Sequence, residues 1–311
     1  MVQQPARLTP APPPPGRERP SRARLALRRA VALVVLLGLL GLAGYAAAYA
    51  VRSRGSDPPP PTTLPLPPPP KPLRIIFPEG FTRAEMADRI TAVNEIASRK
   101  RHVRTKLSER TYLKRTARSA LPAKLAGDHK RRPLEGFLFP ATYEFLPKTT
   151  TKELVAKQLD AFRRNWKKVD LGYARSKNLT PYDVLIIASM IEKEVAVPRE
   201  RPLVAAVIYN RLHARMKLFI DATIRYALGV PPSESLRNSQ LRDPTPYNTR
   251  VHAGLPPTPI ANPGLASMRA AAHPAKVDYL YYARKPDDVH HFFTANERVF
   301  LRYLAEHGYG G

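Results

Sequence analysis

The chain has 311 residues, with 51 Lys and Arg against 25 Asp and Glu, 35 prolines and no cysteine. This length allows one or two domains with a substantial hydrophobic core. The absence of cysteine excludes a disulfide framework, a thiolate zinc site and a cysteine nucleophile. Charge and proline are distributed unevenly, because 17 of the 35 prolines lie in residues 1–72. The first seventy residues therefore differ in composition from the remainder.

Residues 30–51 form a run of 22 residues without a charged side chain. As a helix this run is about 33 Å long, enough to cross a hydrocarbon core of about 30 Å. It exceeds the apolar region of a cleaved signal peptide, and buried core helices rarely continue so far without a polar residue. Seven arginines and one glutamate precede it. The positive-inside rule then predicts a single-pass membrane helix at 30–51, with a basic cytoplasmic tail at 1–29.

Residues 52–72 are rich in proline, with ten prolines between Asp57 and Pro72. Such a segment favours an extended polyproline II spacer of roughly 45–50 Å. We interpret it as a linker that holds an extracytoplasmic domain, residues 73–311, away from the membrane.

Helical and strand patterns alternate in mixed order after residue 72, which predicts an α+β fold. Strand patterns occur at 74–77 and 279–282, and we expect a smaller basic subdomain at 73–170 and a catalytic core at 171–311. Residues 97–132 hold 13 Lys and Arg against Glu109 and Asp128. This segment is either a solvated helical face or a cationic surface for an anionic polymer.

No nucleophile elbow, phosphate-binding loop, dinucleotide-binding glycine run or zinc-protease motif is present. The eight histidines are scattered, and only His290 and His291 are adjacent. Neighbouring residues of a strand point to opposite faces, so we expect neither a metal site nor a cofactor. Carboxylate chemistry is what remains.

Glu192 and Glu194 end an apolar helix that begins with a capping signal at Thr180 and Pro181. A carboxyl half-buried against apolar side chains has a raised pKa, which suits a general acid for a glycosidic oxygen. The alternative is a helix-end salt bridge with Lys193, Arg199 or Arg201. Helical periodicity does not choose between the two glutamates, since both follow apolar residues at the i−4 and i−7 positions.

The helix end resembles the endolytic murein transglycosylase (YceG-like) family, and other motifs follow in the same order. These motifs are Leu134-Glu135-Gly136, Phe139-Pro140-x-Thr142-Tyr143, Ala188 to Glu194, Glu200-Arg201-Pro202, Ile208 to Leu212, Leu218-x-x-Asp221-x-Thr223-x-x-Tyr226, Pro246 to Thr249, Gly254 to Ile260, Asn262-Pro263-Gly264, Ala271 to Pro274 and His291-Phe292-Phe293-Thr294-x-Asn296. The resemblance covers residues 74–303.

The resemblance implies an enzyme of the inner membrane, with its catalytic domain in the periplasm, that cuts nascent glycan strands between MurNAc and GlcNAc. The product would carry a 1,6-anhydro-MurNAc end, formed when the C6 hydroxyl of the sugar attacks C1. The second glutamate of the triplet carries catalysis in that family, which maps onto Glu194. Candidate substrate-binding residues are Asn210, Asp221, Tyr247 and Asn248, each equally suited to a structural hydrogen bond.

Two departures from the family pattern stand out. No LysM-like module is evident between the anchor and Pro78-Glu79-Gly80, so glycan holding could depend on the basic region at 97–132. Phe219 replaces a residue that is commonly polar in the family. The first difference concerns how the strand is held, and the second concerns the fine structure of the cleft.

Two rival functions remain open from the sequence. A hydrolytic muramidase would use Glu194 with Asp221 or Glu192 as a second carboxylate. A non-catalytic scaffold would bind anionic wall polymers through its excess positive charge. Nucleic acid is a disfavoured partner because the predicted anchor places the domain outside the cytosol, whereas the wall-synthesis machinery is a possible one.

Overall fold

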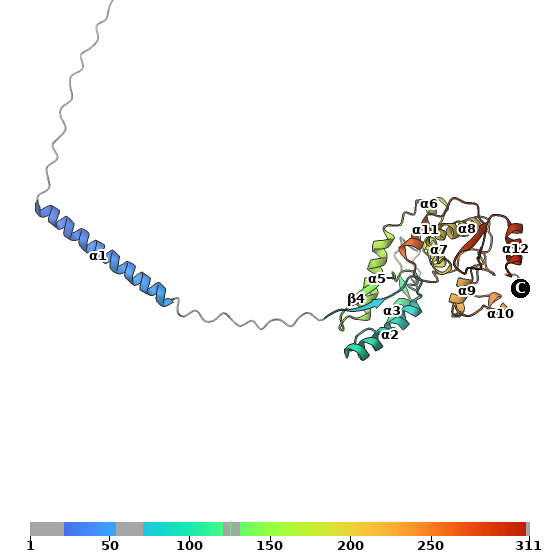
Figure 1. The fold of residues 1–311 in the computed structure, drawn as a ribbon, viewed down its shortest axis with the longest axis horizontal. Helices are drawn as coiled ribbons and strands as arrows, with labels where there is room; N and C mark the ends of the chain where they lie inside the picture. The colour runs from blue at the N-terminus through green and yellow to red at the C-terminus, as the bar shows by residue number, and fades with distance from the viewer. Residues whose placement is uncertain (1–21, 54–70, 121–124, 126–130, 309–311) are drawn as a thin grey trace, which may run out of the picture. The chain divides into compact units, whose positions relative to one another are not determined.

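The computed structural model describes residues 22–53, 71–120, 125 and 131–308, and the chain divides into two units at residue 68 (Figure 1). In the first unit, α1 (Arg22–Ser53) includes a stretch from Ala26 to Ser53 with a mean hydropathy of 2.3. No residue of its most apolar window is buried in the protein. By length and composition this helix is a candidate membrane anchor. Most of the predicted tail and linker, residues 1–21 and 54–70, lies outside the described residues.

The second unit begins with a β-α-α-β arrangement. Strand β1 (Leu73–Ile76) pairs in antiparallel fashion with β4 (Thr142–Phe145), with Leu73 opposite Phe145. Between them lie α2 (Arg83–Arg101) and α3 (Glu109–Ala117), which contact each other. Helix α2 begins after Thr82, which forms a reciprocal capping box with Glu85. A folded unit thus lies between the linker and the later helices, and the absence of a LysM-like module stays a prediction.

The centre of the second unit is built on α7 (Pro181–Glu194), whose residues from Val184 to Ile191 are all buried. Thr180 and Asp183 cap its N-terminus as the sequence predicts. The single polar residue in its buried stretch, Ser189, donates to the carbonyl of Ile186 and accepts the N–H of Ile260 at 3.0 Å. Ser189 therefore fixes a distant loop to the helix at little desolvation cost.

Three helices surround α7 or lie beside it. Helix α11 (Leu265–Ala272) packs on both α7 and α8 (Arg201–His213), and α5 (Thr151–Trp166) contacts α11. The short helices α6 (Gly172–Ser176) and η1 (Pro198–Glu200) connect them. The N-terminus of α8 is therefore placed beside the C-terminus of α7, where the two glutamates lie.

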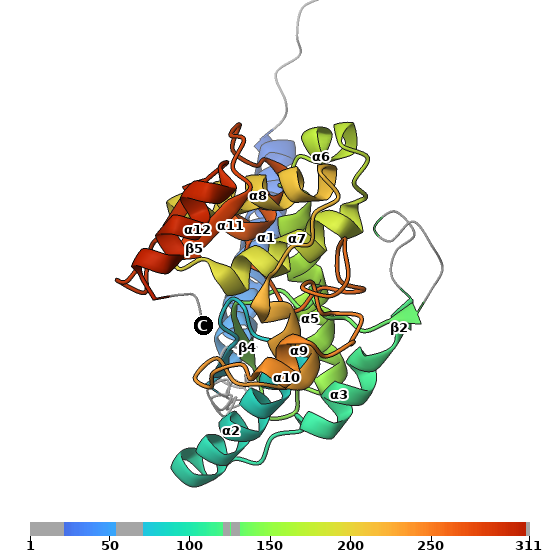
Figure 2. The ribbon, with the colours of Figure 1, turned by 90° about the vertical axis from the view of Figure 1, so that its right-hand side faces the viewer.

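The last part of the chain contains α9 (Asp221–Leu228), α10 (Asn238–Leu241), the antiparallel hairpin β5 (Tyr281–Arg284) and β6 (His291–Thr294), and α12 (Glu297–Glu306). With the small pair β2 (Ser119–Ala120) and β3 (Arg131–Arg132), the described strands form three two-stranded sheets. Mixed helix and sheet is thus confirmed. In Figures 1 and 2, the α2–α3 pair and the α12–β5 segment lie at opposite ends of this unit.

One hydrophobic core runs through the second unit, from Leu73 on β1 to Ala272 on α11. It is continuous across residue 170, because Phe137 packs on both Phe162 of α5 and Tyr182 of α7. The division into subdomains at 73–170 and 171–311 stays a prediction.

Candidate active site

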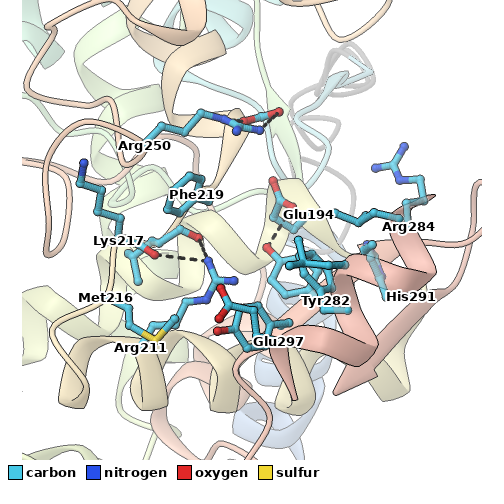
Figure 3. A pocket seen from close by; sticks show the side chains of 17 residues that line it. Glu194, Arg211, Met216, Lys217, Phe219, Arg250, Tyr282, Arg284, His291 and Glu297 are labelled. Atoms are coloured by element: carbon cyan, nitrogen blue, oxygen red, sulfur yellow. Dashed lines mark hydrogen bonds and ion pairs between the residues drawn. The ribbon is translucent and has the colours of Figure 1, made fainter. Parts of the chain in front are cut away.

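A cavity of about 720 Å³ opens beside the C-terminus of α7 (Figure 3). Its walls come from α7, α8, the segment from Met216 to Asp221, the β5–β6 hairpin and α12. These elements are distant in sequence, and the cavity combines carboxylate, guanidinium, phenol and imidazole groups. Its apolar side is formed by Phe300, Leu301 and Leu304 of α12.

Glu194, the last residue of α7, lines this cavity and is half-buried. Its Oε2 accepts a hydrogen bond of 3.1 Å from the Tyr282 hydroxyl. Loss of hydration raises the pKa of the Glu194 carboxyl, the hydrogen bond from Tyr282 opposes this, and the negative charge of Asp221 adds to the increase. The protonated form of Glu194 is thus favoured beyond the usual range of a glutamate, which suits a proton donor.

Glu192 is directed elsewhere and does not line the cavity. Its Oε2 accepts the N–H of Gly264 at 2.9 Å, at the N-terminus of α11, and its Oε1 lies 3.9 Å from Arg201 Nη2. A carboxylate is stabilised at a helix N-terminus by the aligned peptide dipoles. The helix-end salt bridge that the sequence offers as an alternative therefore describes Glu192, whereas the cavity position belongs to Glu194.

Asp221 at the start of α9 lines the same cavity. Arg250 forms a bidentate ion pair with Asp221, with distances of 2.6 Å from Nε to Oδ1 and 3.1 Å from Nη2 to Oδ2. The backbone N–H of Arg250 donates to Asn248 Oδ1 at 2.9 Å, while Asn248 Nδ2 donates to the carbonyls of Leu241 and Asp243. Asn248 is fully buried and supports the Arg250 loop instead of facing the cavity.

Asn210 and Tyr247 also lie outside the cavity. The Asn210 amide donates to the carbonyls of Val277 and Tyr279 at 3.0 and 2.9 Å, which ties the segment before β5 to α8. The Tyr247 hydroxyl shares a 2.8 Å hydrogen bond with Thr258. Of the four predicted substrate-binding residues, the structure brings only Asp221 to the cavity with Glu194.

Sequence reasoning assigned no role to several residues that line the cavity. His291 is buried, and its Nδ1 lies 2.7 Å from Oε2 of the buried Glu200. Arg211 is also buried, and its guanidinium donates to the carbonyls of Leu280 and Leu218 at 2.6 and 2.7 Å. Glu200, Arg211 and His291 lie within the motifs that carry the family resemblance, which is the signal that could have identified them. Tyr282 falls between those motifs.

Another buried glutamate, Glu135, lies away from the cavity, near the N-terminus of α2. Glu135 accepts the backbone N–H of Arg83 at 2.9 and 3.1 Å, the Tyr226 hydroxyl at 3.2 Å and the Asn262 amide at 2.7 Å. Burial raises the pKa of Glu135 to about 7 despite these donors. We name this arrangement of hydrogen bonds the Glu135 cluster. It joins the N-terminus of α2 to α9 and to the loop before α11.

In the described part of the chain, no three His, Asp or Glu side chains gather in a way that could hold a metal ion. The expectation that the protein uses neither metal nor cofactor stays a prediction.

The chain is similar to known proteins over most of its length. The model of the YceG-like family matches residues 62–306. A protein from Bacillus subtilis (strain 168) named endolytic murein transglycosylase is 33% identical over 238 residues, which cover 75% of this chain and 63% of the relative. A protein of the same name from Streptococcus pneumoniae (strain ATCC BAA-255 / R6) is 36% identical over 198 residues, covering 62% of this chain and 35% of the relative.

The matched region thus spans less than two thirds of the length of each of these relatives. The crystal structure of a YceG-like protein from Listeria monocytogenes superposes with a TM-score of 0.60 at 30% identity, covering 75% of this chain and 76% of the other. The family match covers more than half of the chain and includes every element that builds the cavity. The chain therefore belongs to the YceG-like family.

Proposed function

We propose that this protein is a membrane-anchored endolytic lytic transglycosylase of peptidoglycan, which cleaves between MurNAc and GlcNAc and leaves a 1,6-anhydro-MurNAc end. The observation that carries the proposal is the position of Glu194, a carboxyl with a raised pKa that opens onto a cavity of about 720 Å³. The relatives from Bacillus subtilis and Streptococcus pneumoniae are named endolytic murein transglycosylases, which agrees with the proposal.

Glu194 acts first as a general acid in this proposal. It donates its proton to the glycosidic oxygen as the bond from that oxygen to C1 of MurNAc breaks, and the positive charge spreads over C1 and the ring oxygen. The hydrogen bond from Tyr282 stabilises the carboxylate that forms. The carboxylate then takes the proton of the C6 hydroxyl while the C6 oxygen bonds to C1. Glu194 is thereby protonated again, and no water is consumed.

A hydrolytic muramidase is the second candidate, because Asp221 lines the same cavity as Glu194. Hydrolysis with two carboxylates needs the second one as a base or nucleophile. Both oxygens of Asp221 are engaged by Arg250, which limits the contact of this carboxylate with a sugar or a water. The intramolecular reaction needs only Glu194, so the transglycosylase is favoured.

The mass of the glycan ends separates the two reactions. Purified full-length protein is incubated with un-crosslinked glycan strands, and the products are analysed by mass spectrometry. Intramolecular attack gives ends lighter by one water than hydrolytic ends, and we expect these from the wild type and from Asp221→Asn. Reducing ends from the wild type, lost in Asp221→Asn, would establish the muramidase instead.

We further propose that α1 crosses the inner membrane with residues 1–29 in the cytoplasm and the second unit in the periplasm. The length and hydropathy of α1 support a span, and the arginines that precede it support this orientation. A fluorescent reporter that matures only in the cytosol, fused after Gly311, should be dark although the fusion is folded. A bright fusion at the same expression level would reverse the orientation.

A further inference from the structure

The cavity beside Glu194 carries more positive charge than an uncharged sugar needs. Four cationic side chains line it, namely Arg211, Lys217, Arg250 and Arg284. Its carboxyl groups are Glu194, Asp221 and Glu297. Among the described residues, Arg250 is the one cation of this set in a direct ion pair, because it binds Asp221 through both carboxylate oxygens.

Three cations thus remain against Glu194 and Glu297. Burial favours the protonated, uncharged form of Glu194. Glu297 is exposed and is the first residue of α12, where a negative charge is stabilised by the helix N-terminus. Among the described residues it forms no ion pair with the cations of the cavity. Even with this negative charge counted, the three cations leave an excess of positive charge over the cavity.

Arg211 is the buried member of this set, with a relative exposure of 7%. Its Nε and Nη1 donate to the carbonyls of Leu280, Lys217 and Leu218, and in the described part of the chain its Nη2 donates to none. The rings of Phe219 and Tyr281 lie 5.9 and 5.5 Å from the guanidinium. A buried charge without a counter-ion is costly. In these surroundings of low polarity, an anion that reaches Nη2 would be held strongly.

Phe219 shows that this side of the cavity is held in an unfavourable conformation. Its backbone φ is 56°, in the left-handed region that bulky residues avoid, and its side chain is 50% exposed. The ring lies between the guanidinium groups of Arg211 and Arg250, 5.6 Å from the latter (Figure 3). Strain of this kind persists where surrounding structure enforces it, often at ligand sites. Here it separates Arg211 from the ion pair that neutralises Arg250.

Lys217 and Arg284 form the exposed part of the set. In Figure 3 they lie on opposite sides of Glu194, on the segment before α9 and at the end of β5. Neither makes an ion pair or a side-chain hydrogen bond within the described residues. A strand placed with its scissile bond at Glu194 would pass between them.

We propose that Lys217, Arg284 and the Nη2 edge of Arg211 form a carboxylate-recognition subsite, which selects glycan strands bearing acidic groups on muramic acid over uncharged glycans. The proposal rests on the proposed function, because it takes the cavity as the place where the strand binds. The recognised carboxylate could belong to the lactyl ether of MurNAc or to the peptide attached to it. Both present the same chemistry to a guanidinium or an ammonium.

The test measures binding apart from chemistry. The full-length protein carries Glu194→Gln, so that labelled ligands bind without being cleaved. Dissociation constants are measured for this protein and for the same protein with the added substitutions Lys217→Ala and Arg284→Ala. The ligands are strands with intact peptides, strands whose peptides an amidase has removed, and an uncharged chitin oligosaccharide. Lys276→Ala is the matched control, because Lys276 is exposed and lies outside the cavity.

We expect the paired substitution to weaken binding of carboxylate-bearing strands roughly tenfold, from lost charge-assisted contacts. The paired substitution should leave binding of the chitin oligosaccharide unchanged. The control variant Lys276→Ala should bind all three ligands as before. A loss confined to peptide-bearing strands assigns the peptide carboxylates, and a loss confined to stripped strands assigns the lactyl group. Equal loss for chitin, or no loss for either acidic strand, would overturn the subsite.

Arg211→Lys tests the buried member, since it keeps the charge but removes the planar fork. We expect weaker binding of acidic strands with unchanged binding of chitin, and thermal unfolding verifies that the fold persists. If the variant unfolds, the paired exposed substitutions still decide the proposal. Cleavage by protein with an intact Glu194 is recorded separately. Absence of cleavage together with selective binding would refute the proposed reaction and keep the subsite.

Discussion

Glu194 and Glu135 are withdrawn from solvent in the second unit in contrasting ways. At the cavity, Glu194 receives one hydrogen bond, from Tyr282, and opens onto a space that a ligand can enter. In the Glu135 cluster, Glu135 accepts hydrogen bonds from Arg83, Tyr226 and Asn262 and does not line the cavity. Burial raises the pKa of both carboxyl groups.

This contrast shows that a raised pKa alone does not mark a catalytic acid. Buried carboxyl groups in structural networks shift as far as those in active sites. What distinguishes Glu194 is that one oxygen keeps free acceptor capacity toward a cavity, whereas the oxygens of Glu135 are occupied by protein donors. The predictions below separate the two roles, chemical for Glu194 and structural for Glu135.

The largest effect is expected from Glu194→Gln. The amide is nearly isosteric but cannot donate a proton to the leaving oxygen, so turnover of glycan strands should fall by at least about 10²–10⁴-fold. Thermal unfolding should be nearly unchanged. Glu192→Gln is the matched control on the same helix, and it should retain most activity because Glu192 contacts Gly264 and Arg201 outside the cavity. An inactive Glu192→Gln beside an active Glu194→Gln would show that the other glutamate is the acid.

Substitution of Glu135 should change the free energy of unfolding and its pH dependence, and not turnover. The reason is that the Glu135 cluster lies away from the cavity. The folded-state pKa of Glu135 is about 7, above the ordinary glutamate value of 4.5. The folded state therefore binds the proton more tightly than the unfolded state, and this contribution is complete below about pH 4.5 and is lost as the pH rises to about 7. The shift of about 2.5 pH units corresponds to about 3 kcal/mol.

Chemical denaturation of the wild type and Glu135→Gln across this pH range measures the effect. The wild type should lose more unfolding free energy than the variant between pH 4.5 and 7, by an amount of this order. Above pH 7 the two curves should run parallel. Parallel curves throughout the range would mean that Glu135 titrates as an ordinary exposed glutamate. Turnover of folded Glu135→Gln should stay within a few-fold of the wild type.

A substitution at Gly136 measures how closely the chain is packed beside the Glu135 cluster. Its φ is +85°, and an added Cβ would lie 2.7 Å from the Cβ and Cγ of Pro259 and 3.2 Å from a methyl group of Leu185. Gly136→Ala should therefore destabilise the fold through both backbone strain and overpacking. Gly254→Ala is the control, because its φ is +91° and its Cβ would meet nothing within 4 Å. The difference in unfolding free energy between the variants should be about 2 kcal/mol, and equal values would exclude the steric contribution.

The sequence predicts local structure well where a capping motif is complete. Thr82 with Glu85 and Thr180 with Asp183 place two helix starts correctly, because capping acts over three residues. The late strand lies at 281–284, two residues after the pattern at 279–282, because its limits are set by pairing with His291 to Thr294. Cross-strand pairing is not encoded within the strand itself.

The candidate site was predictable only in part. Periodicity left Glu192 and Glu194 equivalent, and the contacts that separate them come from Gly264 and Tyr282, which are 72 and 88 residues away. Asn210 was a reasonable polar candidate, yet its amide is used to hold two carbonyl groups of the chain. Such contacts between distant segments depend on tertiary packing, which one sequence without the fold does not specify.

The smallest effect is expected from Tyr282→Phe, which removes the one hydrogen bond that the Glu194 carboxyl receives from the described residues. This bond stabilises the ionised carboxylate and so lowers the pKa of Glu194 against the effect of burial. Without it the pKa should rise further. The acid must be protonated to act, so the decline of kcat/KM at high pH should move upward by up to about one pH unit, equivalent to about 1.4 kcal/mol.

Tyr281→Phe provides the control, because Tyr281 is adjacent on β5 and lines the same cavity, while within the described residues its hydroxyl makes no hydrogen bond. Its pH profile should match that of the wild type. Maximal turnover of Tyr282→Phe should fall only several-fold, because Glu194 itself is retained. A high-pH limb that stays in place or moves downward in Tyr282→Phe would mean that another group limits the rate there. Access to the cavity would then be the remaining difference between Glu194, with its one donor, and Glu135, with several donors.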